Sequence, residues 1–308
     1  MPPRQKDLEN MELLKVGTAH SHFIQKFGYL GAFEKLKECG FDSVDFSFYY
    51  NQNADDYILR KSDEDLKEFC LKLKSTADEA GIFVGQTHAP YYFDPPERFC
   101  DEEFIKVFKQ AIKATAYLGS KYIVIHPALC EDPENNHQRV MRTNTAFFKA
   151  LQPLAVELGV TIAIENLCFV PPVKWPGLIS ATFSAAKLIE LIDGLGEGFC
   201  ACLDTGHAFF SGQEPATFAR LLGNRLKVLH MQDGDGENDA HMPATLGRIN
   251  WDEFLKALSD VNYQGVLNME MSYRRFGGLN NILETGKFVS EIGREFARKI
   301  EAYKGGNV

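Results

Sequence analysis

The feature that most constrains this chain is an eight-fold alternation of short apolar runs with amphipathic stretches. The apolar runs, several of them rich in β-branched residues, end at His20, Phe48, His88, His126, Glu165, Asp204, His230 and Glu270. Near-continuous apolar runs are typical of strands that are buried on both faces, as in a parallel sheet. Helical patterns lie between most of them, at 28–39, 62–80, 101–118, 142–158, 182–192, 251–258 and 286–303. This order predicts a series of βα units in a protein of the α/β class.

Eight βα units predict a closed (β/α)8 TIM barrel, in which helices surround a ring of parallel strands. An open, doubly wound sheet is the alternative architecture. It is less well supported, because the first strand is not followed by the Gly-x-Gly-x-x-Gly turn that binds dinucleotide phosphates. The 308 residues suffice for one large core, and no linker rich in proline, glycine or serine divides them. We therefore expect a single domain over 1–308, with its core at 11–303.

The composition indicates where the protein is located and which kinds of partner it binds. The 33 Lys and Arg against 42 Asp and Glu give a formal charge of -9, which makes nucleic acid an unlikely partner. No apolar run reaches the roughly 20 residues of a membrane-spanning helix, and the start lacks the apolar segment of a secretory signal. The cysteines form no Cys-x-x-Cys pair, and we interpret Cys200 and Cys202 as packing inside the barrel. We expect a cytoplasmic protein without membrane contact.

The residues that end six consecutive strand runs are all metal-ligand types. They are His88, His126, Glu165, Asp204, His230 and Glu270. Any one of them could merely cap a strand or bind a loop amide. Because the carboxyl ends of all strands in a barrel meet at one rim, however, six such residues at equivalent strand ends predict a common site.

Charge indicates what this site would bind. Glu165, Asp204 and Glu270 would repel one another and raise each other's pKa unless a cation lies among them. Together with the imidazole of His230 they predict a site for one divalent ion, namely Mn²⁺, Mg²⁺, Co²⁺ or Zn²⁺. Further polar residues that could extend the site follow the sixth and seventh strands, namely His207, Asp233, Asp235, Asp239 and His241.

The motifs, taken in order, resemble those of the xylose isomerase-like barrel superfamily, and most closely its sugar phosphate isomerase/epimerase branch. They are THAP at 87–90, IHPA at 125–128, IENL at 164–167, CLDTGHAFFSG at 202–212, GRINW at 247–251 and MEM at 269–271. In that branch a Glu, an Asp, a His and a Glu hold a divalent ion, and the two Glu also act as acid and base. The resemblance implies these roles for Glu165, Asp204, His230 and Glu270.

Endonuclease IV is a more distant relative that binds three zinc ions. The resemblance places its ligands at His88, His126, Glu165, Asp204, His207, His230, Asp239, His241 and Glu270, all of matching type. Two features differ from the relatives. The loop after His230 lacks the longer segment with Ser, Lys and Arg of the nuclease, and PATLG at 243–247 replaces the usual Pro-Gly-Glu-Gly of the isomerase-like members. The five residues outside the central four could therefore bind either substrate or further ions.

We consider three functions. The first is a metal-dependent isomerase or epimerase of a sugar or sugar-like polyol ketone, working through an enediolate with Glu165 and Glu270 moving the proton. Elimination of water from a cyclic polyol is a related outcome. The second is a multi-zinc phosphodiesterase, and the third is a sugar-binding module or one subunit of a larger enzyme. Assembly into a homo-oligomer is left open.

Aromatic residues near the strand ends could form walls for a sugar. Trp175 and Phe46 are the main candidates, joined by Phe48, Tyr49 and Tyr50, with ordinary packing as the alternative. The nonperiodic stretch at 167–181, which contains Trp175, is predicted to form a lid over the mouth of the barrel.

Overall fold

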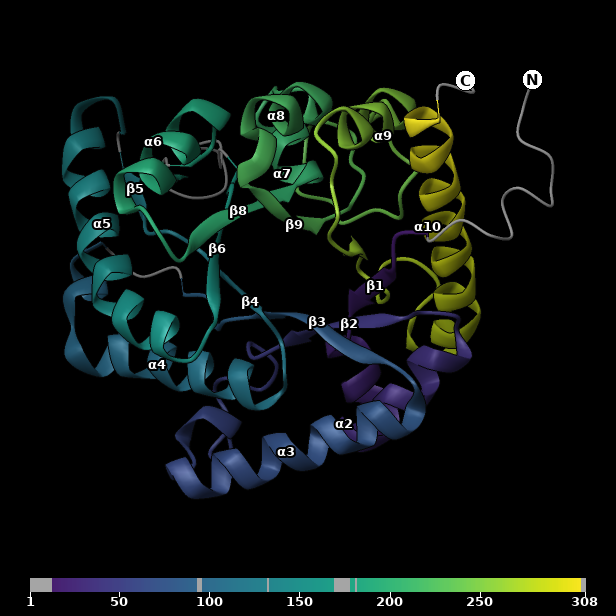
Figure 1. Cartoon of the computed structure of the whole chain (residues 1–308), viewed down its shortest axis with the longest axis horizontal. Coiled ribbons are helices and arrows are strands. Elements are labelled where there is room, and N and C mark those ends of the chain that lie inside the picture. Colours follow the sequence, from purple (N-terminus) through teal and green to yellow (C-terminus); the bar gives the residue numbers. More distant parts are fainter. Residues whose placement is uncertain (1–12, 93–95, 132, 169–177, 181, 306–308) are drawn as a thin grey trace.

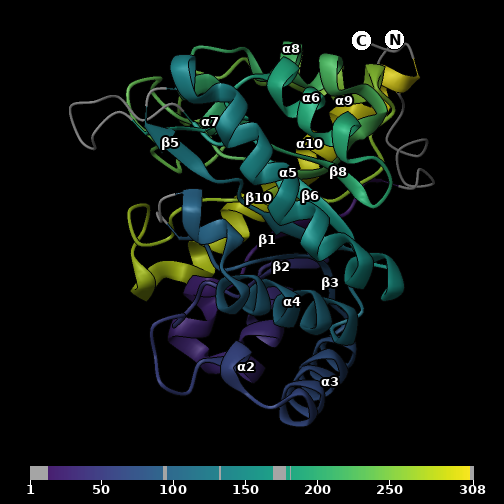
Figure 2. The same ribbon diagram turned by 90° about the vertical axis from the view of Figure 1, so that its left-hand side faces the viewer.

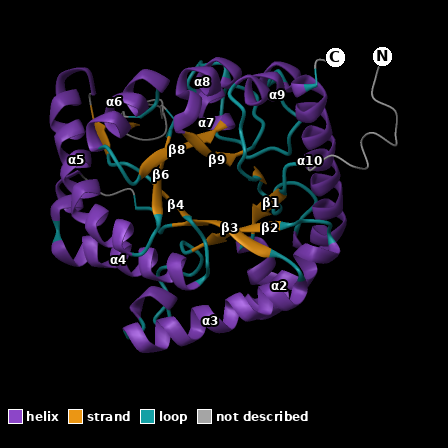
Figure 3. Ribbon diagram, in the orientation of Figure 1, coloured by secondary structure: helices purple, strands orange, loops and turns teal. Residues whose placement is uncertain are grey.

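Eight parallel strands form the inner ring of the structure, and helices form the outer layer (Figure 1, Figure 3). The computed structural model describes residues 13–92, 96–131, 133–168, 178–180 and 182–305. The strands of the ring are β1 (Val16–Ala19), β2 (Ser43–Ser47), β3 (Phe83–His88), β4 (Tyr122–Ile125), β6 (Thr161–Glu165), β8 (Phe199–Asp204), β9 (Leu226–His230) and β10 (Leu267–Met269). This architecture confirms the predicted (β/α)8 barrel.

The ring is closed between β9 and β10. The other neighbours pair in the order β10-β1-β2-β3-β4-β6-β8-β9. Met231 and Met269 then form a parallel bridge beyond the end of β9. There the Met231 amide donates to the Asn268 carbonyl at 2.8 Å, and the Glu270 amide donates to the Met231 carbonyl at 2.9 Å. Closure brings the carboxyl ends of the first and last strands to the same rim.

The outer layer follows the strands in sequence order. Its helices are α2 (Ser21–Glu38), α3 (Asp63–Ala80), α4 (Glu102–Tyr117), α5 (Pro133–Glu157), α6 (Ala185–Leu195), α7 (Thr205–Phe210), α8 (Pro215–Leu222), α9 (Trp251–Asp260) and α10 (Ile282–Lys304). Single 3-10 turns lie at Ile58–Arg60, Pro96–Cys100, Gly223–Arg225 and Leu279–Asn281. Neighbouring helices pack on one another, as Figure 2 shows for α3, α4 and α5.

Polar caps explain where several helices begin. The side chains of Ser62, Asp101, Ser184 and Asn250 each accept a backbone N–H from the first turn of α3, α4, α6 and α9. Such caps satisfy amides that have no partner within the helix. They mark the strand-to-helix connections, so the helix starts predicted near these residues are close to those observed.

Other helix boundaries differ from the predicted ones. α2 begins at Ser21 rather than at 28, and its helical conformation is interrupted at Gly28, where φ is 72° and favours glycine. α5 begins at Pro133 rather than at 142. No helix was predicted after the sixth strand, where α7 and α8 lie, because each is too short to show a clear period.

A small antiparallel pair of strands was also not predicted. β5 (Leu129–Glu131) pairs with β7 (Leu178–Ser180) shortly after the carboxyl end of β4. β7 falls within the predicted lid at 167–181. Most of that lid, residues 169–177 and 181, lies outside the described residues, and so does the proposed wall residue Trp175.

Two apolar regions support the barrel. The larger lies between the ring and the helices and contains most of the buried phenylalanines. The smaller lies inside the ring and consists of Val124, Ala163, Cys200, Cys202 and Val228. It confirms the interpretation of the two cysteines as core residues, and it forms the floor below the strand ends. Among the described residues, no helix combines the length and the apolar character needed to cross a membrane.

Candidate active site

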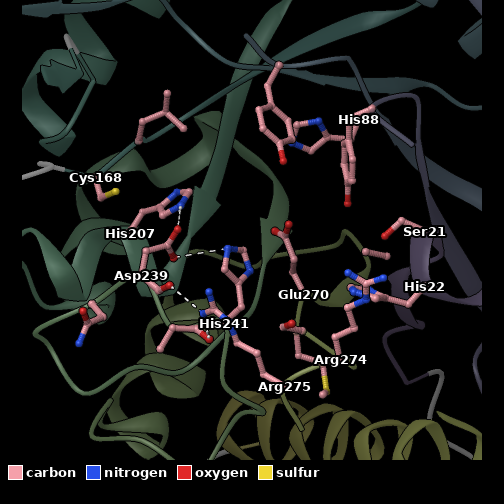
Figure 4. A pocket seen from close by; sticks show the side chains of 18 of the residues that line it. Ser21, His22, His88, Cys168, His207, Asp239, His241, Glu270, Arg274 and Arg275 are labelled. Atoms are coloured by element: carbon pink, nitrogen blue, oxygen red, sulfur yellow. Dashed lines mark hydrogen bonds and ion pairs between the residues drawn. The ribbon is translucent and has the colours of Figure 1, made fainter. Parts of the chain in front are cut away.

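A cavity of about 1210 Å³ opens at the carboxyl ends of the strands, where the predicted site residues meet (Figure 4). Glu165 and Glu270 line the cavity, Asp204 and His230 lie fully buried beside them, and one ligand atom from each of the four lies within 4.8 Å of the others. The Nδ1 atom of His230 is 2.8 Å from Glu270 Oε2 and 3.3 Å from Glu165 Oε1. The structure therefore brings together the four residues that were predicted to hold a divalent ion.

The central four residues present buried polar atoms of the kind a cation would satisfy. Glu165 Oε2, His230 Nδ1 and Glu270 Oε2 are buried and make no hydrogen bond of regular geometry among the described residues, and their close contacts join carboxylates to imidazoles within the cluster. Glu165 and Asp204 are completely enclosed, and Glu270 is only 14% exposed. Buried carboxylates grouped in this way are costly unless a positive charge lies among them. This donor set of three carboxylates and one imidazole fits a divalent ion.

The pKa values of these groups show how strongly they interact. Burial disfavours ionised Glu165, but His230 and His126 outweigh it and hold its pKa well below the usual range. In the same way, burial is outweighed by His230 at Glu270, whose pKa falls to about 2. At Asp204, by contrast, burial prevails and raises the pKa to about 6. Burial also disfavours protonated His230, yet the surrounding negative charges raise its pKa well above 6.5, so a proton supplies positive charge here.

A second group of ligand types shares Glu165 with the first. Glu165 Oε2 lies 3.0 Å from His126 Nε2 and 3.4 Å from His88 Nε2. The Nδ1 atom of His88 lies 2.7 Å from the Ala89 carbonyl, which fixes the ring so that Nε2 faces the carboxylate. His88, His126 and Glu165 are thus close enough to bind one ion together, or to bind substrate hydroxyls.

A third group lies farther out in the cavity. His207 Nε2 is 3.7 Å from Asp239 Oδ2, and His241 Nε2 is 3.4 Å from Asp239 Oδ1. Asp239 outweighs burial and raises the pKa of His241 to about 9. Cys168 joins this group with a ligand atom within 4.8 Å of His207 and Asp239, a contact that was not predicted. Burial raises the pKa of the Cys168 thiol to about 11.

Three polar side chains next to the ligand groups, those of Asn166, Thr205 and Gln232, link the ends of neighbouring strands by hydrogen bonds. Asn166, which follows Glu165, accepts the Asp204 amide at 2.7 Å and donates to the Asp204 carbonyl at 3.0 Å, so it joins β6 to β8. Thr205 donates its hydroxyl to the Gln232 carbonyl at 2.6 Å, which joins β8 to the segment after β9. Gln232 in turn donates its amide to Asp204 Oδ2 at 2.9 Å.

Asp45 is a functional candidate that sequence reasoning missed. Its Oδ2 atom lies 2.9 Å from His230 Nε2 and accepts the Gln86 amide at 3.0 Å, and all three side chains are buried. The signal was present, since Asp45 is the one acid within the apolar run that ends at Phe48. A lone acid in a buried strand requires a polar or cationic partner.

In the loop after β9, Asp239 and His241 reach the ligand groups, whereas Asp233 and Asp235 bind parts of the loop itself. Asp233 was predicted to extend the site, but its Oδ2 atom accepts the Trp251 indole N–H at 2.7 Å and its Oδ1 atom accepts the amides of Gly234 and Ile249. It therefore holds the loop in shape. Asp235 lies farther along the loop, where it accepts backbone amides of a turn.

The aromatic walls differ in part from those predicted. Tyr49 and Tyr50 line the cavity, together with Tyr91. Phe46 does not, because it is completely buried and packs on the ring of His20, with 4.2 Å between the ring centroids. Phe48 is also part of the core. The prediction of Phe46 as a substrate wall is therefore wrong, since this residue belongs to the layer between β2 and the helices.

Comparison with known proteins connects this site to others. The uncharacterised protein MJ1311 of Methanocaldococcus jannaschii is 26% identical over 54% of this chain and 56% of its own length. D-psicose 3-epimerase of Enterocloster bolteae is 26% identical over 66% of each chain. A probable endonuclease 4 of Listeria innocua is 28% identical over 74% of this chain and 76% of its own. The match thus spans little more than half the length of the first of these relatives.

Solved structures and a family model agree on the fold. The crystal structure of a D-tagatose 3-epimerase-like protein superposes with a TM-score of 0.70, at 22% identity, over 92% of this chain and 99% of the other. At this identity the likeness shows a shared fold. The family model described as xylose isomerase-like TIM barrel matches residues 33–299, which includes every strand of the ring except β1. The chain belongs to the xylose isomerase-like TIM barrel family.

Proposed function

We propose that the protein is a divalent-metal-dependent isomerase or epimerase that acts on a sugar or a sugar-like polyol ketone. The observation that carries this proposal is the convergence of Glu165, Asp204, His230 and Glu270 within 4.8 Å, with the two glutamates facing the cavity. Support also comes from the relative named D-psicose 3-epimerase and from the fold shared with the D-tagatose 3-epimerase-like protein. The substrate would be a small carbohydrate rather than a nucleic acid.

The four central residues would hold the ion, and a divalent ion bound there supplies a Lewis acid that polarises the substrate carbonyl. The chain itself supplies the proton transfer. Glu270 is the better placed base, because its side chain is 14% exposed to the cavity whereas that of Glu165 is 1% exposed. The positive charge of His230 outweighs burial and lowers the pKa of Glu270 to about 2 in the metal-free protein, so Glu270 is in the ionised form that a proton acceptor requires.

The outcome of the reaction depends on Glu165. Glu165 ends β6 and Glu270 directly follows β10, and these strands are not neighbours in the ring, so the carboxylates approach the cavity from different positions. If Glu165 reaches the opposite face of the substrate, it returns a proton there and the product is an epimer. If only Glu270 reaches the carbon, isomerisation or loss of water follows.

A multi-metal phosphodiesterase is the second candidate, and one observation favours it. Besides the central four, His88, His126 and Glu165 form a second ligand group, and Cys168, His207 and Asp239 form a third. The relatives named probable endonuclease 4 match three quarters of the chain. The formal charge of -9 weighs against a DNA substrate.

Metal analysis and a substrate panel separate the two candidates. The metal content of the purified protein would be measured, followed by assays on ketoses, inososes and abasic DNA. The proposed function predicts about one divalent ion per chain and conversion of a ketose or inosose. Two or three zinc ions per chain together with nicking of abasic DNA would overturn it.

A further inference from the structure

The cavity has a basic side that the proposed reaction does not use. His22, from the first turn of α2, and Arg274, from the segment after β10, both line the cavity. Figure 4 shows them together on one side of Glu270, with His207 and Asp239 on the other side. The cavity therefore combines an acidic, metal-ligating centre with a positively charged flank.

The guanidinium of Arg274 has no acceptor among the residues that the structure describes. Within the part of the chain that the structure describes, it makes no ion pair and no hydrogen bond. The neighbouring Arg275 differs, because it donates to the carbonyls of Asp239 at 3.4 Å and Ala240 at 3.1 Å. Several arginines outside the cavity pair with carboxylates, namely Arg220, Arg225, Arg294 and Arg298. Arg274 is exposed on the wall of the cavity, so its guanidinium is available to an anion that enters there.

The charged groups that act on His22, the neighbour of Arg274, are positive. Burial lowers the pKa of His22, and the positive charges of Arg274 and His241 lower it further. His22 is therefore neutral at neutral pH, and its ring N–H together with the guanidinium of Arg274 offers hydrogen-bond donors to an anion. A guanidinium binds phosphate or carboxylate through two parallel hydrogen bonds, which makes arginine the typical residue for such groups.

Arg274 is also placed where it could bind one end of a substrate. It lies four residues after Glu270 on the same segment, so a group bound to it would be next to the proposed base. The cavity, at about 1210 Å³, exceeds the roughly 300–1,000 Å³ of ordinary small-molecule sites and has room for more than a neutral sugar. A bound anion at this flank would hold the far end of the substrate while the carbonyl faces the central four residues.

We propose that Arg274 and His22 form a subsite for an anionic group of the substrate, a phosphate or a carboxylate at the end of the sugar remote from its carbonyl. This inference rests on the proposed function in one respect only, that the substrate is a sugar. The binding of an anion at Arg274 can be measured without any turnover.

The first experiment titrates the purified protein, with its metal content held constant, with inorganic phosphate in a calorimeter. Arg274→Gln is expected to weaken phosphate binding by about five- to tenfold, because it removes a charge-assisted hydrogen bond at a partly exposed site. Arg274→Lys, which keeps the charge, should lose less. Arg298→Gln is the matched control, since it makes the same change in net charge on α10 and should leave phosphate binding unchanged.

The second experiment compares ketoses that carry a terminal phosphate, a terminal carboxylate or no charge. Arg274→Gln should lower kcat/KM for the charged ketoses and leave the neutral ones unaffected, and the preferred charged ketose tells phosphate from carboxylate. Equal losses for charged and neutral ketoses, or phosphate binding unchanged by Arg274→Gln, would overturn the subsite. If no ketose is converted while Arg274→Gln weakens phosphate binding, the proposed function fails and the anion subsite remains.

Discussion

The Oδ2 atom of Asp45 lies 2.9 Å from the Nε2 atom of His230, in the interior of the barrel. This contact occupies one ring nitrogen of His230 and leaves the other, Nδ1, facing Glu165 and Glu270. A carboxylate behind a metal-ligating imidazole fixes its tautomer and orientation and increases its basicity. Gln86 donates to the same Asp45 oxygen at 3.0 Å, so the carboxylate is itself held in place.

We expect Asp45→Asn to weaken binding of a divalent ion by about 10- to 100-fold, in the range known for residues that support a ligand from behind. The amide keeps a hydrogen-bond acceptor for His230 but loses the negative charge. Affinity would be measured by calorimetric titration of the metal-depleted protein with Mn²⁺ or Zn²⁺.

Asp42→Asn is the matched control for this variant. Asp42 lies three residues earlier and pairs with Arg294 of α10, away from the cavity. Its substitution should lower the melting temperature slightly and leave metal affinity unchanged. Equal loss of affinity in both variants would mean that Asp45 contributes only to stability.

Metal affinity should rise with pH. Although burial favours neutral His230, the carboxylates around it raise its pKa well above 6.5, so the imidazole of the metal-free protein carries a proton at neutral pH. An ion that binds Nδ1 must displace the proton of the imidazole. Metal binding therefore releases a proton, and the affinity for the metal rises as the pH rises. Titrations in buffers of different ionisation enthalpy would count the protons released. An affinity that stays constant between about pH 6 and pH 8 would contradict this account.

Glu270→Gln should remove most turnover while the protein remains folded. The amide cannot accept a proton, whereas its oxygen can still face the ion, so metal binding should weaken only in part. The rate of ketose conversion and the metal affinity would be measured on the same preparation. If the variant keeps full activity, Glu270 has no role in proton transfer.

The part of the site that the sequence predicted lies at the strand ends. Glu165, Asp204 and His230 each close an apolar run, and the barrel geometry brings all such positions to one rim. Asp45 was missed because it lies inside its run rather than at the end of it, and its partner His230 is 185 residues away. A contact at that separation depends on which side chains point into the ring, and one sequence does not show this.

The prediction of Phe46 as an aromatic wall for the substrate was wrong for a similar reason. Phe46 and Tyr49 lie close together in the sequence, yet Phe46 packs in the core whereas Tyr49 lines the cavity. In a strand buried on both faces, alternation no longer distinguishes the side that faces the helices from the side that faces the ring. Arg274 and His22 gave no signal either, because an isolated basic residue, whether in a loop like Arg274 or in a helix like His22, is ordinary until the structure shows it lining a cavity.

The contact between α10 and β1 should tolerate no added side chain. A Cβ atom at Gly293 would lie within van der Waals overlap of Val16 in β1. Gly293→Ala should therefore destabilise the protein by about 1–3 kcal/mol, the usual cost of overpacking a core. Gly194→Ala, in α6, is the control, since nothing lies within 4 Å of its added Cβ and alanine favours a helix. Urea denaturation of both variants would measure the difference, and equal stabilities would show that α10 can move away from β1.

The role of His126 distinguishes a single-ion site from a multi-ion site. Its Nε2 atom lies 3.0 Å from Glu165 Oε2, and its side chain is 22% exposed, so it can reach either a second ion or a substrate hydroxyl. If it binds substrate, His126→Ala will raise KM or lower turnover and leave the metal content at about one ion per chain. If it is a ligand of a further ion, the metal content will fall, and zinc will predominate in the unmodified protein because imidazole-rich sites favour it. His137→Ala in α5, which removes an imidazole that contacts Lys187 at 3.0 Å, should change neither quantity. We expect the first outcome, because the net acidity of the chain and the short loop after His230 disfavour a duplex substrate.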